Sequence, residues 1–222
     1  RISAAKWALE KFGVTVFVLD DGFQHRKVRR DLDIVCIDAT NPFGNGKMLP
    51  AGILREPING FRRADAVVIT RAHLIPNVEE IVGQIRSCNE ECRIFLSENL
   101  VSNVRTLEEF HAQTQRTQNK TIKEKGLAFC ALGNPSNFFD QLRQNNFKLV
   151  QTKTFSDHHF YSQEDVSILE KIANESGAEV FLTTAKDAVK LKDLKFEIPC
   201  LVVEIEVKID DEKGFRALVN AS

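Results

Sequence analysis

The sequence predicts an α/β protein in which a parallel sheet covered by helices is followed by a second, smaller α/β domain. Three observations lead to this fold class. Short apolar runs alternate with helical patterns, which is typical of strands buried on both faces of a parallel sheet. The region between about residues 98 and 125 is polar and has no periodicity. A new series of apolar runs then begins at Gly126.

These patterns divide the chain into residues 1–100, which form the larger core, a linker over 101–125, and a smaller domain over 126–222. A chain of 222 residues is long enough for each part to bury a core of its own. The hydrophobic content of 43% and the charged content of 27% are ordinary for a globular protein.

The first part opens with a predicted helix, ISAAKWALEKF, which ends at Gly13 in a C-cap position. Predicted strands follow at residues 14–19, 32–39, 64–71 and 93–96. The spacing of apolar residues from 78 to 88 predicts an amphipathic helix. The first two strands are too close in sequence for a parallel crossover of about a dozen residues. Either they form a hairpin, or the link leads into an edge strand.

The second part continues the alternation. Predicted strands lie at residues 126–132, 147–155, 179–183 and 200–205. A helix carrying Phe138 begins at a cap formed by Asn134 or Ser136, and a second helix over 163–176 begins at Ser162.

Two adjacent carboxylates, Asp20 and Asp21, end the first apolar run and are followed by Gly22. In open α/β sheets ligands bind at the carboxyl ends of strands, and phosphotransferases hold Mg²⁺ with an Asp in that position. An Asp after an apolar strand is also a common helix N-cap or turn former. The residues alone fit both interpretations.

A long irregular segment, TNPFGNGKMLPAGILREP, contains three Gly and three Pro in 18 residues. A loop of this length in a compact domain is usually functional or disordered. Its Gly44, Asn45 and Gly46 can present backbone N–H groups to an anion, and Arg55 beside Glu56 supplies a fork donor and a carboxylate. The alternative is a solvated surface loop with an incidental ion pair.

Two motifs of the second part carry polar chemistry. Asp157-His158-His159 lies between a strand and a helix, where a His can be presented to a ligand and oriented by the neighbouring acid. A surface His pair is the simpler interpretation, and no third ligand is evident for a metal. In TTAKDAVKL, Lys186 and Asp187 either contact a phosphate or cap a helix, and we favour the structural role.

Composition excludes some classes of function. The net charge of -1 gives no reason to expect a nucleic-acid partner. Five scattered Cys residues favour reduced thiols in a cytosolic compartment over a disulfide framework. No apolar run approaches the roughly 20 residues of a membrane-spanning helix.

Taken together, the motifs resemble one family, the tetraacyldisaccharide 4′-kinases of lipid A synthesis. The strings that carry the resemblance are LDDGFQHRKVRRDLDIV, GNGKMLPAGILREP, ALGNPSNFF, TFSDHHFY and TTAKDAVKL. They occur in collinear order over nearly all of the chain. The sequence departs from the family's usual pattern at Ser156, where Pro is common, and at Ala185, where Glu is common. The second departure puts any acid function at that position in doubt.

The resemblance implies transfer of the ATP γ-phosphate to the 4′-hydroxyl of tetraacyldisaccharide 1-phosphate, giving lipid IVA, with ATP and Mg²⁺ as cofactors. It implies that residues 1–100 are the carboxyl-side part of a P-loop-kinase-like core with its Walker B segment. The expected partners are the acylated disaccharide lipid and, peripherally, a membrane surface, at the cytoplasmic face of the bacterial inner membrane. The basic cluster Arg26–Arg30 either meets anionic headgroups or is a solvated turn.

By the same resemblance Asp20 and Asp21 hold Mg²⁺, while Gln24 and His25 line the same crevice on the nucleotide side. We expect Asp21 to serve both the metal and the nucleotide.

The remaining expected roles concern the transferred group. Arg55 and Glu56 orient phosphate and metal-bound water, and His158 supports the base or positions the sugar hydroxyl. Between His158 and His159 we prefer the first.

The sequence contains no GxxxxGK[ST] phosphate loop, and GNGK at Gly44 lacks its spacing and hydroxyl residue. The family carries that loop, and a proposed catalytic base, before the point where Arg1 begins. A chain that opens with a crossover helix also lacks the strand expected before it. We therefore expect a fragment with little or no kinase activity alone.

Two other classes of function remain open. A haloacid-dehalogenase-type phosphohydrolase also places an Asp after a strand, but it uses Asp-x-Asp, and Gly22 occupies the place of the second acid. A non-catalytic α/β binding module is the other.

Overall fold

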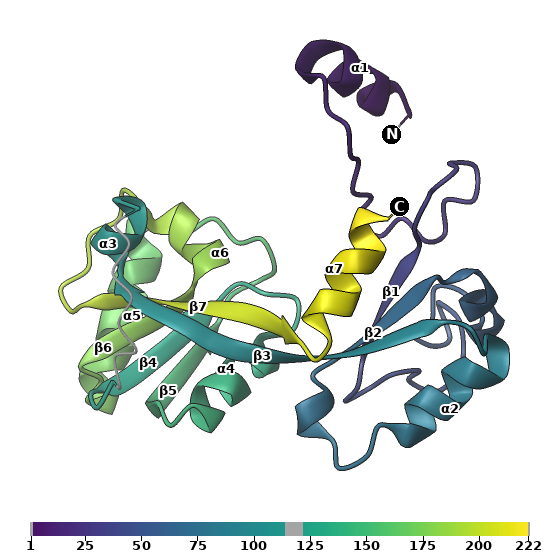
Figure 1. Ribbon diagram of the computed structural model, residues 1–222. Coiled ribbons are helices and arrows are strands. Elements are labelled where there is room, and N and C mark those ends of the chain that lie inside the picture. The colour runs from purple at the N-terminus through teal and green to yellow at the C-terminus, as the bar shows by residue number, and fades with distance from the viewer. Residues whose placement is uncertain (1, 114–121, 222) are drawn as a thin grey trace. The chain divides into compact units, whose positions relative to one another are not determined.

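The computed structural model describes residues 2–113 and 122–221. The chain divides into two compact units, one formed by residues 1–98 with 208–222 and the other by residues 99–207. The strand order is β1-β2-β3-β7-β6-β4-β5 (Figure 1). The strands β3 and β7 each contribute residues to both units.

The first unit contains the strands β1 and β2, parts of β3 and β7, and the helices around them. Its elements are α1 (Ile2–Phe12), β1 (Ile34–Asp38), η1 (Ile58–Arg63), β2 (Ala66–Thr70), η2 (Ala72–Leu74), α2 (Glu79–Cys88), the start of β3 (Arg93–Thr106), the end of β7 (Cys200–Ile209) and α7 (Glu212–Asn220). The strand β2 pairs in parallel with both β1 and β3.

The central strand β2 is buried on both faces, as its apolar sequence predicts. Ile69 packs with Ile85 of α2 on one face. Val68, on the other face, belongs to a cluster that includes Phe95 and Phe215 of α7, whose rings lie 5.2 Å apart. The predicted strands over 64–71 and 93–96 and the helix over 78–88 are therefore confirmed.

The second unit repeats the alternation of strands and helices. It contains the end of β3, α3 (Leu107–His111), β4 (Lys125–Cys130), α4 (Pro135–Gln144), β5 (Lys148–Thr154), α5 (Gln163–Ser176), β6 (Val180–Thr184), α6 (Ala185–Ala188), η3 (Val189–Leu191) and most of β7. The strands β5, β4, β6 and β7 are all paired in parallel.

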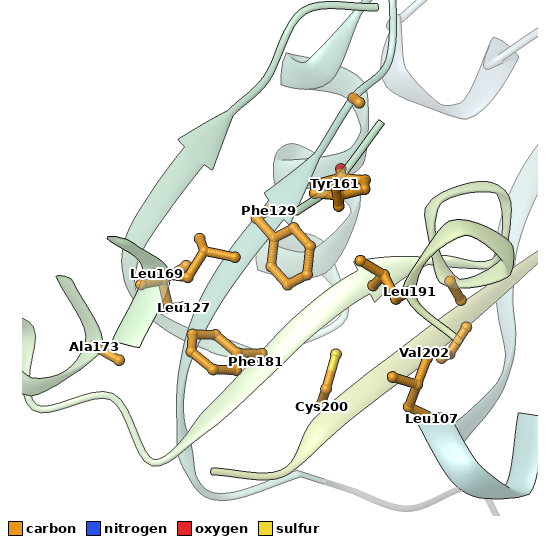
Figure 2. Close-up of a cluster of buried hydrophobic side chains, with 12 residues drawn as sticks. Leu107, Leu127, Phe129, Tyr161, Leu169, Ala173, Phe181, Leu191, Cys200 and Val202 are labelled. Carbon is orange, nitrogen blue, oxygen red and sulfur yellow. The ribbon is translucent and has the colours of Figure 1, made fainter. Parts of the chain in front are cut away.

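The strand β3 runs antiparallel to β7, because Glu98 meets Lys208 whereas Arg105, further along β3, meets Glu204, earlier in β7. The sheet is thus mixed but mostly parallel, and the predicted α/β class is confirmed. Aromatic residues fill the core of the second unit: Figure 2 shows Phe129 between Tyr161 and Phe181, with ring centroids 5.7 and 6.0 Å apart.

The predicted strand over residues 14–19 is wrong. The segment forms no strand, and Val16 and Val18 are 76% and 91% exposed. A strand needs a neighbour for its backbone N–H and C=O groups, and within residues 2–113 and 122–221 no strand pairs with it. The proposed hairpin is therefore absent from the described residues. The edge-strand alternative fits, because β1 stands at the end of the strand order.

The structure also differs from the expected domain boundaries. Residues 101–111 of the expected linker continue β3 and form α3, which begins with a capping box at Thr106. Residues 114–121 of that linker lie outside the described residues. Residues 208–222, expected in the smaller domain, belong to the first unit, where α7 covers β2 and β3.

Candidate functional site

The segment after Asp20 and Asp21 is a tight turn held from within by Arg30. The Arg30 guanidinium donates to the carbonyls of Gly22 and His25 at 3.3 and 2.7 Å and to the carboxylate of Asp33 at 2.7 and 3.0 Å. Gly22 is buried, and a Cβ at this position would lie 2.7 Å from the Leu19 Cβ. The turn therefore requires glycine for close backbone approach.

Asp21 lies in the left-handed region, with φ of 49°. Its carboxylate accepts a hydrogen bond from Arg55 at 2.5 Å, and both side chains are more than half exposed. This contact brings together two motifs that are 34 residues apart in sequence. An exposed ion pair of this kind adds little stability. What it does is place the Arg55 guanidinium beside the Asp21 carboxylate.

Glu56, which follows Arg55 in the sequence, is paired with two arginines, Arg63 and Arg26. The Arg63 guanidinium donates to both carboxylate oxygens at 2.9 and 3.2 Å, and Arg26 lies 3.5 Å away. Burial alone would raise the pKa of Glu56, but the hydrogen bond from Arg63 and the charges of Arg63 and Arg26 outweigh it and hold the pKa below its usual value. Glu56 is therefore a fixed, ionised carboxylate at neutral pH.

Arg63 also fixes the turn. Its guanidinium lies over the Phe23 ring, 4.2 Å from the centroid, and donates to the Phe23 carbonyl at 3.1 Å. The same residue thus links Glu56 to the backbone between Gly22 and Gln24. The side chains of Asp20, Gln24 and His25 are exposed.

The loop over residues 40–57 is organised by its own Asn45. The Asn45 amide donates to the Ala51 carbonyl at 2.8 Å, and its oxygen accepts from the Lys47 N–H at 3.1 Å. The Gly46 N–H, which we expected to face an anion, donates to the Phe43 carbonyl at 2.9 Å. This N–H serves the loop itself rather than an anion site.

A cavity of about 520 Å³ lies between this loop and α2. Phe43 and Gly44 line it from the loop, and Ile58 and Ile81 line it from the two helical segments. It also contacts Ala39, directly after β1, so it lies at the carboxyl edge of the strands, where open α/β sheets bind ligands.

In the second unit the two histidines of the DHH motif have different environments. His158 has a φ of 61° and a side chain that is 74% exposed, with its Nε2 3.7 Å from Asp157. His159 is 27% exposed, lies 3.0 Å from Asp165 and stacks on Phe155 with centroids 4.8 Å apart. His159 is therefore part of the packing, whereas His158 is presented to solvent.

In the TTAKDAVKL motif Asp187 has a structural role, although Thr184 and not Lys186 or Asp187 caps the helix. Asp187 is fully buried, and its carboxylate accepts from the Thr184 hydroxyl at 2.7 Å and from the Ala131 N–H at 3.2 Å. Its own N–H donates to Thr184, which caps α6.

Comparisons with known proteins identify the same family that the sequence motifs resemble. The family model described as tetraacyldisaccharide-1-P 4'-kinase matches residues 1–222, the whole chain. The chain belongs to the tetraacyldisaccharide-1-P 4'-kinase family.

Curated members of the family are similar throughout the chain. The tetraacyldisaccharide 4'-kinase of Halothermothrix orenii is 33% identical over 99% of this chain and 61% of its own length. That of Geobacter metallireducens is 39% identical over 99% of this chain and 62% of its own. The chain thus spans about three fifths of the length of these relatives.

A solved structure has the same fold. The structure of the "apo" form of LpxK from Aquifex aeolicus in complex with ATP superposes with a TM-score of 0.68 at 27% identity. The match covers 99% of this chain and 61% of that one.

The residues expected to hold Mg²⁺ in this family member suit that ion. Within residues 2–113 and 122–221 no three His, Cys, Asp or Glu side chains gather as a metal cluster. Mg²⁺ does not need one, because it usually keeps several waters and binds one or two carboxylates plus substrate phosphates. The exposed, adjacent carboxylates of Asp20 and Asp21 match that requirement.

Sequence reasoning missed Arg63, which orders both Glu56 and the Asp21 turn. Arg62 and Arg63 are adjacent at the end of η1, and nothing in the sequence distinguishes them.

The described helices include none that is long and apolar enough to cross a membrane.

Proposed function

We propose that the complete protein containing this chain transfers the γ-phosphate of ATP to the 4′-hydroxyl of tetraacyldisaccharide 1-phosphate, giving lipid IVA. The observation that carries this proposal is the contact between Asp21 and Arg55, which brings the carboxylate turn and the arginine loop of the family together. The chain matches about three fifths of its relatives, so the activity is assigned to the whole protein.

In this proposal Asp20 and Asp21 hold Mg²⁺, directly or through water. The bound ion supplies charge neutralisation for the transferring phosphoryl group. Arg55 hydrogen-bonds the carboxylate of Asp21 and offers its remaining N–H donors to a phosphate oxygen, because a guanidinium has five such donors. Gln24 and His25, both exposed on the same turn, line the nucleotide side.

Glu56 acts as a carboxylate of fixed position and charge. Its pKa is held low by Arg63 and Arg26, so it orients water or metal-bound water by accepting hydrogen bonds and does not act as an acid near neutral pH. His158, exposed beside Asp157, supports the base or positions the sugar hydroxyl.

The acceptor is an acylated lipid, so we place the reaction at a membrane surface, on the cytoplasmic face of the bacterial inner membrane. Arg26, Lys27 and Arg29 are exposed and offer positive charge to anionic headgroups. The protein would bind peripherally.

The test is a phosphoryl-transfer assay with the complete protein, ATP, Mg²⁺ and tetraacyldisaccharide 1-phosphate. We expect acceptor phosphorylation that a chelator abolishes and that Asp21→Ala lowers by at least a hundredfold. The control is Asp31→Ala, an exposed acid of the same segment, which should keep wild-type activity. Phosphate release without acceptor phosphorylation would indicate the phosphohydrolase, and full activity of Asp21→Ala would refute the metal assignment.

A further inference from the structure

Two motifs of the second unit meet at one buried carboxylate, and a third contacts the lysine that pairs with it. Asp187 has no exposed surface, and it accepts hydrogen bonds from Thr184 of its own motif and from the backbone of Ala131, where ALGNP begins. A buried carboxylate needs a positive partner, because leaving it unpaired is strongly unfavourable. Lys190, one helical turn later, has its Nζ 3.9 Å from the Asp187 carboxylate.

Lys190 also holds the third motif. Its Nζ donates to the carbonyl of His159 at 3.0 Å, and its side chain is only 19% exposed. Before His158 in the sequence, the Asp157 carboxylate lies 3.6 Å from the Nζ of Lys186. Two lysines of TTAKDAVKL therefore hold the residues that flank His158.

The turn needs such support because its backbone is strained. His158 has a φ of 61°, and a non-glycine residue in this region persists where the surroundings fix it. The His158 N–H donates to the Asp157 side chain and the His159 N–H donates to the Ser156 carbonyl, each at 3.0 Å. The direction of the His158 imidazole therefore depends on how firmly its neighbours, Asp157 and His159, are held.

We propose that Lys190, anchored by Asp187, is a positioning residue that sets the orientation of His158 through the His159 carbonyl. The inference rests on the proposed role of His158 in phosphoryl transfer. Lys190 itself does not touch substrate in this account. Its removal therefore lowers turnover while leaving substrate binding largely intact.

The kinetic test compares Lys190→Met with Lys192→Met in the complete protein. Met keeps the apolar stem and removes the charge, and Lys192 is an exposed lysine two residues further along. We expect Lys190→Met to lower kcat at least tenfold with the KM for each substrate within twofold, and Lys192→Met to match the wild type. An unchanged kcat for Lys190→Met overturns the proposal.

A second variant decides the matter if Lys190→Met does not fold. Asp187→Asn combined with Lys190→Met removes both charges, so no unpaired carboxylate remains buried, and the Asn oxygen still accepts from Thr184 and Ala131. We expect a folded protein with the same loss in kcat. Wild-type turnover of this double variant overturns the proposal.

Hydrogen exchange without substrate separates this inference from the proposed function. The His159 amide should exchange at least fivefold faster in the Lys190→Met protein than in the wild type, with Lys192→Met unchanged. If the wild type is not a kinase, faster exchange still supports the positioning role and only the proposed function falls. Unchanged exchange, or faster exchange with unchanged kcat in an active wild type, overturns the inference.

Discussion

Glu56 is the residue whose electrostatics are most tightly determined, because two guanidinium groups hold a carboxylate that is only 15% exposed. Its pKa in the folded state lies below the usual value of 4.5. Such a group stabilises the fold above its unfolded pKa, and this contribution is lost as the pH falls through the folded value. Part of the acid sensitivity of the first unit should therefore come from this site.

The prediction is that Glu56→Gln lowers the free energy of unfolding by about 1–3 kcal/mol at pH 7. The difference from wild type should shrink as the pH falls from 4.5, where the unfolded carboxylate gains a proton, through the lower folded pKa, where the native carboxylate also becomes neutral. Urea unfolding at a series of pH values measures it, with Glu91→Gln, an exposed glutamate, as the control. A difference that stays constant down to the acid limb would contradict the account.

The two adjacent histidines give a second prediction at the residue scale. His159→Gln should destabilise the protein by about 1–2 kcal/mol, because it loses the contact with Asp165 and the stack on Phe155. His158→Gln should change stability by less than about 0.5 kcal/mol, since its side chain is 74% exposed, yet it should lower turnover. Unfolding and activity measured on both variants separate the roles, and the opposite pattern would mean that they are exchanged.

Among the elements, α5 has the clearest start signal. Ser162 accepts from the Asp165 N–H at 3.3 Å, and the Asp165 carboxylate accepts from the Ser162 N–H at 2.9 Å. The Asp165 carboxylate also contacts His159, so this cap lies beside the DHH turn. Burial alone would raise the pKa of Asp165, but the hydrogen bonds from His159 and Ser162 outweigh it and keep the carboxylate ionised.

Ser162→Ala should therefore cost about 1 kcal/mol of stability, measured by thermal or urea unfolding. Ser167→Ala is the matched control within the same helix, where alanine is a good helix former and the serine is exposed. Equal effects of the two substitutions would show that the capping box contributes nothing.

The elements that the sequence predicted well are those with a strong local signal. The strand over 66–70 is a continuous apolar run, and the helix over 163–176 has both a cap and amphipathic spacing. Residues 14–19 have an equally apolar run, but strand formation depends on a neighbour, which local sequence does not reveal. The packing of α7 in the first unit likewise depends on a tertiary contact, that of Phe215 with Phe95.

The site shows the same limit. The twin acids, Arg55, Glu56 and His158 are candidates because their motifs resemble those of the family, whereas the residue types alone also fit a structural interpretation. The contact between Asp21 and Arg55 depends on the folding of a loop 34 residues away, and the role of Arg63 depends on which side of η1 it faces. Neither follows from the residues alone.

At the scale of the whole molecule, the chain carries the carboxylate turn and the His158 turn but no GxxxxGK[ST] segment. A phosphotransferase of this kind needs such a loop to hold the nucleotide phosphates. We predict that the 222-residue chain expressed alone gives no acceptor phosphorylation above background in the assay that detects the complete protein. Turnover comparable to that of the complete protein would show that the nucleotide is held by residues of this chain.

The most direct measurement is a titration of Mn²⁺, as a paramagnetic substitute for Mg²⁺, into the complete protein with a non-hydrolysable ATP analogue, followed by electron paramagnetic resonance. Asp20→Asn and Asp21→Asn should each weaken Mn²⁺ binding at least tenfold relative to the wild type, and Asp31→Asn should not. Unchanged Mn²⁺ affinity in both variants, with the analogue bound as in the wild type, would contradict the claim that these two carboxylates hold the metal.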